Sequence, residues 1–98
     1  MPFDDETLVF KVCGKMFALL SLNENLALNL KCAPNKAIEL REQYDFIVPG
    51  YHMNKKHWNT IALDKADRIL LYELIDHSYN QVVLKLPHKR RITLAEKL

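Results

Sequence analysis

One window near the middle of the chain gathers side chains that could do chemistry. Residues 49–60 read Pro-Gly-Tyr-His-Met-Asn-Lys-Lys-His-Trp-Asn-Thr, which brings together two histidines, two lysines and the single tryptophan. Lysines can neutralise phosphate groups, and an exposed tryptophan can stack on a nucleobase. Lys55 and Lys56, with His52, are therefore candidate contacts to a nucleic acid, and Trp58 is a candidate stacking residue.

A purely structural interpretation of this window competes with the binding one. A lone tryptophan is well buried in most folds, so the simpler role for Trp58 is a core anchor. Pro49 and Gly50 are typical of a turn. A short charge cluster discriminates weakly between phosphate contact and plain solvation, so both interpretations of Lys55 and Lys56 remain open.

The C-terminal end is a second basic region. The net charge of the whole chain is only +2, but basic residues are concentrated from Lys85 onward. The candidate phosphate contacts in this region are Lys85, Lys89, Arg90 and Arg91. Cations suit the C-terminus of a helix, which accounts for Lys85 but not for the run at 89–91. A tail that contacts a polyanion and a merely solubilising tail both remain open.

The patterns expected of enzymes and metal sites are weak. His52 and His57 are five residues apart, with no cysteine or carboxylate at ligand spacing. No serine or cysteine has a recognisable base and orienting partner. We therefore expect a non-enzymatic protein without a metal or cofactor. An enzyme that used His52 or His57 would need a deep pocket around those rings.

Cysteine usage and hydropathy indicate the compartment. Cys13 and Cys32 do not form a close-spaced pair, and the acidic first residues do not resemble a secretory signal. No apolar run approaches the roughly 20 residues that a membrane helix needs. We expect a cytoplasmic protein with reduced thiols and no membrane partner.

Strand-forming residues and turns predict a meander that would position these groups. The predicted strands are residues 7–12, 15–22, 26–32 and 57–63. A two-residue turn at 13–14 would place Val12 opposite Lys15 and Phe10 opposite Phe17. A turn at 23–25 would place Ala18 opposite Leu30.

Two predicted helices complete the fold. The first covers 34–44, with Pro34 in its first turn and Arg41 pointing outward. The second covers 64–86, with Asp64 as its N-cap. About four antiparallel strands with helices packed on one face make an α+β two-layer sandwich. Residues 1–87 would form a single domain, followed by a basic tail over 88–98.

The predicted register leaves one sheet face uncovered and partly aromatic. Phe10 and Phe17, with Leu19 beside them, are candidates for a stacking platform or an interaction face. A cross-strand aromatic pair is more often structural. A protein-interaction or small-ligand-binding module that uses this face is the alternative to nucleic-acid binding.

Several segments together resemble the MmcQ/YjbR family. They are residues 7–12, 14–19, 40–44, 49–60 and 73–79, and they follow the family's order across residues 2–86. The resemblance implies a CyaY-like α+β fold with helices on one side of an antiparallel sheet. It also implies the role proposed for the family, DNA binding, which rests on the likeness of the fold to a double-wing phage transcription-factor domain.

The N-terminus departs from the family pattern. Members usually begin with a further helix before the segment that matches Pro2–Asp4, whereas Met1 stands directly before it here. Without that helix, part of the Leu20/Leu28 face would be uncovered, which favours a homodimer. Frataxin proteins, which share this type of fold, bind iron through an acidic first helix. Because that helix is missing from this sequence, we expect no iron site. The leading hypothesis is weak, largely sequence-independent DNA binding.

Overall fold

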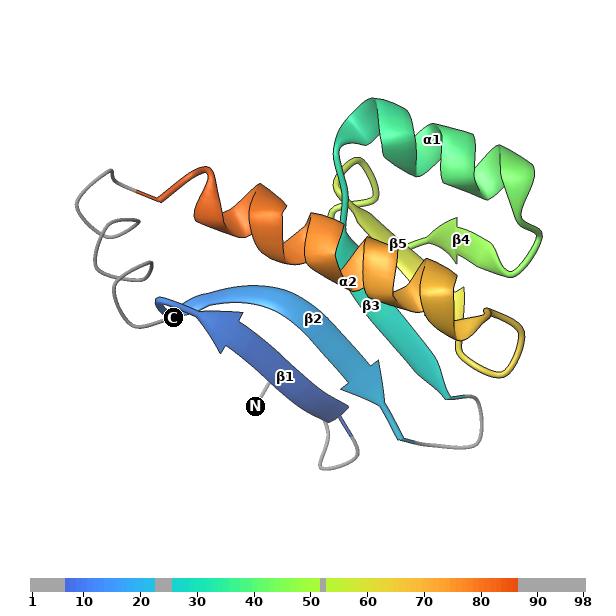
Figure 1. The fold of residues 1–98 in the computed structure, drawn as a ribbon, viewed down its shortest axis with the longest axis horizontal. Coiled ribbons are helices and arrows are strands. Elements are labelled where there is room, and N and C mark those ends of the chain that lie inside the picture. The colour runs from blue at the N-terminus through green and yellow to red at the C-terminus, as the bar shows by residue number, and fades with distance from the viewer. Residues whose placement is uncertain (1–6, 23–25, 52, 87–98) are drawn as a thin grey trace.

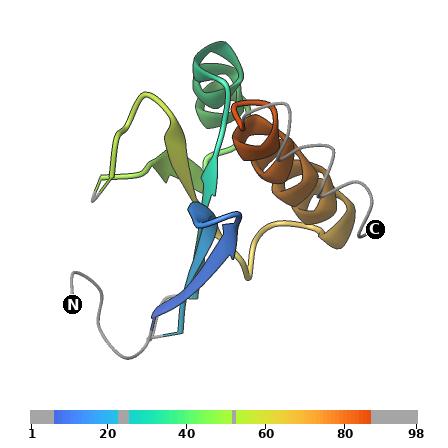
Figure 2. The same cartoon turned by 90° about the vertical axis from the view of Figure 1, so that its left-hand side faces the viewer.

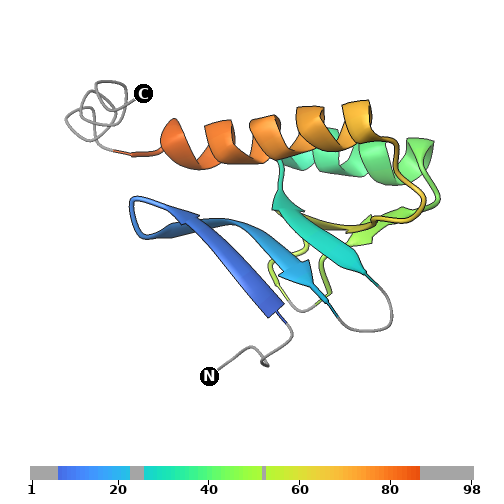
Figure 3. The same cartoon turned by 60° about the horizontal axis from the view of Figure 1, so that its bottom comes forward.

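The structure, a computed structural model, describes residues 7–22, 26–51 and 53–86. Its elements are β1 (Thr7–Val12), β2 (Lys15–Ser21), β3 (Ala27–Lys31), α1 (Pro34–Gln43), β4 (Ile47–Pro49), β5 (Trp58–Ala62) and α2 (Arg68–Val83). The strands form one antiparallel sheet in the order β1-β2-β3-β5-β4 (Figure 1). Both helices lie on the same face of the sheet (Figure 3). The predicted α+β class is confirmed.

The hairpin between β1 and β2 closes as predicted and then shifts register. Cys13 and Gly14 both have positive φ, 49° and 78°, as a two-residue hairpin turn with φ > 0 at both positions requires. Val12 lies opposite Lys15, as predicted. The expected pairing of Phe10 with Phe17 is wrong, because the register shifts at this point.

A β-bulge explains that error. The register changes between Phe10 and Lys11, so Phe10 lies opposite Ala18. An extra residue on one strand shifts every later partner by one, and a shift by one moves side chains to the other face of the sheet. Leu8 and Phe10 therefore share the face of Ala18, and this is the face on which the helices lie.

The core lies between the sheet and the two helices. Ala18 pairs with Leu30, as predicted, and both are buried. The buried residues of this cluster are Ala18, Leu28, Leu30, Cys32, Ala37, Leu40, Ile47, Ile61 and Leu74. Burial of these apolar side chains is what holds α1 and α2 against the strands.

The start of α2 and the presence of β4 are the main differences from the prediction. Asp67 is the N-cap of α2, and its carboxylate accepts a hydrogen bond from the Leu70 N–H at 2.8 Å, so the predicted cap at Asp64 is wrong. Both aspartates are typical cap residues, and the turn after β5 decides between them. The short strand β4 was also missed, since its three residues precede Gly50 and read as the start of a turn.

Within the described ranges, neither helix is long and apolar enough to cross a bilayer.

Candidate functional site

Ser78 in α2 joins three elements at one end of the sheet. Its side chain is fully buried, accepts a hydrogen bond from the Lys31 N–H at 2.8 Å and donates one to the Phe17 carbonyl at 2.5 Å. The β2–β3 ladder ends at the pair of Ala18 and Leu30. The hydroxyl of Ser78 thus satisfies the two backbone groups that follow the last rung, and β2 and β3 separate beyond it (Figure 1).

His77 makes the adjacent contact between α2 and the chain. Its Nε2 accepts a hydrogen bond from the Ala33 N–H at 3.2 Å, directly before α1 begins. The neutral ring must therefore carry its proton on Nδ1. Burial, and next the charge of Lys36, lower the pKa of His77 below its ordinary value of 6.5.

The stability of the protein is expected to fall as the pH drops through and below 6.5. Because the pKa of His77 is lower in the folded than in the unfolded chain, the unfolded chain binds the proton more readily, and protonation favours unfolding. His57, whose pKa is also lowered, acts in the same direction. Urea unfolding at pH 7.5, 6.5 and 5.5 measures the loss. The His77→Gln variant should lose less stability than the wild type over this range. An equal loss in the two proteins would show that His77 does not contribute.

Arg41 in α1 holds the loop between β4 and β5. Its Nε donates to the Asn59 side-chain oxygen at 2.6 Å, and its terminal nitrogen donates to the carbonyls of Lys55 and, at 3.4 Å, Trp58. Asn59 is 2 % exposed and donates in turn to the Ala37 carbonyl of α1. The expectation that Arg41 points outward is therefore wrong, because its guanidinium satisfies backbone carbonyls of this loop.

Hydrogen bonds within the loop, residues 50–57, fix its path further. The Gly50 N–H donates to the Trp58 carbonyl at 2.8 Å, and the Trp58 N–H donates to the Asn54 carbonyl at 3.0 Å. The Asn54 side chain also accepts from the Lys56 N–H. A side-chain carbon at Gly50 would lie 2.9 Å from the Trp58 Cβ, so this close approach requires glycine. The loop is packed directly on Trp58 and is anchored at several points.

These contacts gather basic side chains from separate elements at the opened end of the sheet. We call this group the basic patch; its members are Lys15, Lys31, Lys56, His57 and Lys85. The Cys32 N–H donates to the His57 carbonyl at 2.7 Å, which brings the loop beside Lys31. Ser78 fixes the backbone of Lys31, and Lys85 follows Ser78 by two helical turns. Lys15 stands two residues before Phe17, the other partner of Ser78.

The charges of other members of the patch act on Lys31 and on His57. Partial burial, and next the charges of Lys85 and Lys15, lower the pKa of Lys31. Desolvation lowers the pKa of His57, and Lys85, Lys31 and Lys56 lower it further. The charges that act on both groups are thus all positive. Such a site can hold an anion. Among residues 7–22, 26–51 and 53–86, no group of three or more His, Cys, Asp or Glu could hold a metal ion.

The sites predicted from sequence separate into distinct groups. Lys55, Lys56 and Lys85 are exposed. His52, Lys89, Arg90 and Arg91, and the tail over 88–98, lie outside the described residues. Trp58 is 7 % exposed and is a buried anchor, in line with its structural interpretation.

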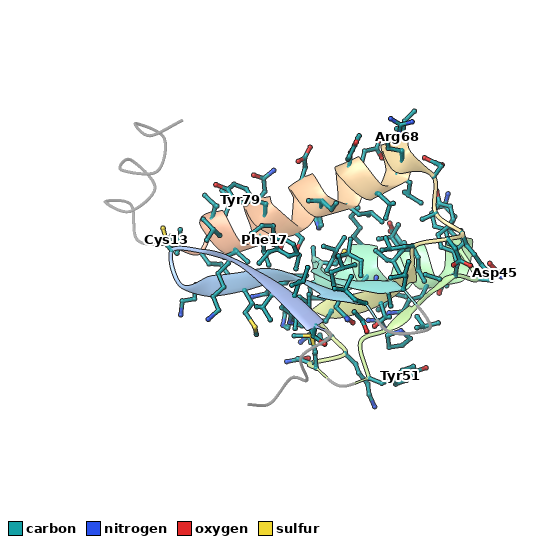
Figure 4. All side chains as sticks on the ribbon, turned by 90° about the horizontal axis from the view of Figure 1, so that it is seen from below. Cys13, Phe17, Asp45, Tyr51, Arg68 and Tyr79 are labelled. Atoms are coloured by element: carbon teal, nitrogen blue, oxygen red, sulfur yellow. The ribbon has the colours of Figure 1, made fainter. Side chains whose placement is uncertain are left out.

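The aromatic interaction face is not assembled as expected. Leu19 is 2 % exposed, whereas Phe10 is 44 % exposed on the edge strand. Phe17 instead packs edge-to-face on Tyr79 of α2, with ring centroids 5.4 Å apart (Figure 4). Phe10 is thus the exposed member of the three.

Sequence reasoning missed Lys15, Lys31, Arg41, Tyr51 and Ser78. One signal could have found Ser78: it continues the apolar stripe of Leu74 and Val82 at a spacing of four, where a polar residue needs a buried partner. Lys15 and Lys31 carry no such signal, because their proximity depends on how β2 and β3 pair in the sheet.

The fold and site define a small α+β protein with a basic patch at one end of its sheet, and comparison with known proteins gives the family. The YjbR family model matches residues 1–81, so the chain belongs to the YjbR family. The uncharacterized protein YbdF of Escherichia coli O157:H7 is 43 % identical over 84 residues, which are 84 % of this chain and 69 % of that protein. The uncharacterized protein YjbR of Escherichia coli K12 is 39 % identical over 88 residues, which are 88 % and 75 % of the two chains.

Solved structures are similar as well. The crystal structure of Deinococcus radiodurans protein DR2400, described as a DUF419 domain, matches with a TM-score of 0.87 and 45 % identity. The match covers 97 % of this chain and 75 % of that one. A protein from Pseudomonas syringae matches with a TM-score of 0.67 and 28 % identity over 76 % of this chain and 74 % of its own.

Proposed function

We propose that this protein binds DNA through phosphate contacts made by the basic patch, largely without regard to sequence. The observation that carries the proposal is the convergence of Lys15, Lys31, Lys56 and Lys85 from four separate segments of the chain. Lys55 stands beside them in the same loop as Lys56. Phosphate contacts fix a protein on a nucleic acid but carry no sequence information directly, so weak and general binding is the expected outcome.

The electrostatics of the free protein support this proposal. Like charges held close together repel, and desolvation disfavours the charged form of the half-buried Lys31. Phosphate groups placed among the lysines would relieve that repulsion. A patch that is unfavourable in the free protein and favourable in a complex is typical of a binding site.

A salt titration tests the proposal. Fluorescence anisotropy of a labelled duplex and of a single strand of equal length would measure affinity from low to physiological salt. Each phosphate contact should contribute about −0.9 for the duplex, or about −0.7 for the single strand, to the slope of log K against log salt. With the four lysines engaged, we expect the affinity to fall steeply. No binding at low salt, or binding without a salt slope, would overturn the proposal.

An interaction module on strand β1 is the second candidate. Leu8 and Phe10 are 45 % and 44 % exposed, and β1 is an edge strand, which can pair with another chain. A second copy of this protein could dock there. The titration above distinguishes the two functions, since Phe10→Ser should leave DNA affinity unchanged if the basic patch carries the binding. Loss of DNA binding in the Phe10→Ser variant would instead favour the β1 surface as the binding site.

A further inference from the structure

An exposed aromatic ring without a place in the core lies in the same loop as Lys56 and His57 of the basic patch. Tyr51 lies in the loop between β4 and β5 and is 63 % exposed. The Lys55 ammonium lies over this ring, with Nζ 5.4 Å from the ring centroid. That distance is within the range of a cation–π contact, which restricts the motion of both side chains.

Tyr51 and Lys31 lie on the same side of the sheet. Side chains alternate along β3, so Lys31 points to the face opposite the one to which the buried Leu30 points. Leu30 belongs to the core beneath the helices, which places Lys31 on the helix-free side. The loop that carries Tyr51 also extends away from the helices, and Tyr51 itself lies on that side (Figures 2 and 4).

Three other aromatic rings, those of Trp58, Phe17 and Phe10, are less suited to stacking on a ligand at this patch. Trp58 is 7 % exposed and lies under the loop, where Gly50 is packed against it. Phe17 is packed against Tyr79. Phe10 is exposed, but it belongs to β1, three strands away from β5 in the sheet order.

We propose that Tyr51, together with Lys55, stacks on an unpaired base, and that the preferred ligand of the basic patch is therefore single-stranded DNA. This inference rests on the proposed function. A duplex hides the faces of its bases in its own stack, whereas a single strand presents them to an aromatic ring. The ammonium group of Lys55 remains close enough to meet the adjacent phosphate.

The anchoring of the loop strengthens the inference. Arg41 binds the carbonyl of Lys55, and Gly50 and Asn54 tie both ends of the loop to Trp58. A stacking side chain on an anchored loop loses less conformational entropy on binding than one on a free loop. The backbone of Gly50, directly before Tyr51, is thus held in place before the ligand arrives.

Substitution of Tyr51 tests the inference with three probes. The probes are a labelled single strand of thymidines, a duplex of the same length, and an abasic strand that has the same phosphates but no bases. We expect the wild type to bind the thymidine strand more tightly than the duplex. Tyr51→Ala should lower the affinity for the thymidine strand roughly 5- to 100-fold, the effect of losing one stacked base. Tyr51→Phe keeps the ring and should retain most of the affinity.

The abasic strand and the duplex separate stacking from charge. Tyr51→Ala should bind both of these probes as the wild type does, because the lysines are unchanged. Equal affinity of Tyr51→Ala and wild type for the thymidine strand, or equal affinity of the wild type for strand and duplex, would overturn the inference but leave the proposed function standing. Failure of all three probes to bind would overturn both. Tyr51 is exposed, and circular dichroism melting of each variant would verify that the fold is intact.

Discussion

Replacing Ser78 by alanine is expected to destabilise the protein by about 2–4 kcal/mol, a large share of the ~5–15 kcal/mol that stabilises a small domain. The variant loses the hydroxyl that accepts from the Lys31 N–H and donates to the Phe17 carbonyl. Both backbone groups then lose this partner, next to a side chain that is fully buried in the wild type. An unsatisfied buried group contributes about 1–3 kcal/mol of destabilisation, and the slightly better helix propensity of alanine offsets little of it.

Urea unfolding followed by circular dichroism measures this effect, with Asn80→Ala as the matched control. Asn80 lies in the same helix but is exposed, so its replacement should change the stability by only a few tenths of a kcal/mol. If Ser78→Ala unfolded at the same urea concentration as the control, Ser78 could not be the link between α2 and the opened strands. Because Ser78 positions Lys31, a Ser78→Ala protein that remains folded should also bind DNA less tightly.

Removal of three charges from the basic patch is expected to weaken DNA binding roughly 100-fold or more at low salt, since a hydrogen bond to a charged group contributes about 1.5–3 kcal/mol and each 1.4 kcal/mol is tenfold. The variant replaces Lys31, Lys56 and Lys85 by glutamine. Its salt slope should fall by about one unit for each phosphate contact that is lost. The melting temperature of the free protein should remain the same or rise, because these lysines repel one another.

A second triple variant provides the matched control. Lys11, Lys65 and Arg68 are exposed and do not belong to the basic patch, so their replacement by glutamine removes the same net charge from elsewhere. We expect this variant to keep most of its affinity. Equal losses in the two variants would mean that net charge alone attracts DNA and that the arrangement of the patch is irrelevant.

Local residue chemistry determined much of the fold from sequence. The turn at Cys13–Gly14, the strand over 7–12 and the start of α1 at Pro34 are all where the sequence places them. Each depends on neighbours along the chain: positive φ in the turn, strand-forming residues, and a proline where the first helical N–H needs no partner. The bulge after Phe10 could not be predicted, because it changes the pairing between two strands without leaving a local signature.

The window over 49–60 shows both what the sequence indicates and what only the structure adds. Its composition indicated the family and distinguished a buried anchor, Trp58, from exposed lysines. It did not indicate that Arg41 holds the loop or that Tyr51 is the exposed ring beside Lys55. The first fact depends on a contact between helix α1 and the loop. The second depends on a contact between residues four positions apart within the loop.

The sequence by itself determined that this is an α+β protein of the YjbR family with basic residues in the 49–60 window and at its C-terminal end. Only the tertiary structure decided that the charges of Lys15 and Lys85 act on Lys31, and that those of Lys31, Lys56 and Lys85 act on His57. The physical reason is that β3 pairs with both β2 and β5, and that Ser78 of α2 binds the backbone of Lys31 and of Phe17. That arrangement brings together charges that are up to 70 positions apart in the sequence. Local sequence patterns do not predict contacts between residues so far apart in the chain.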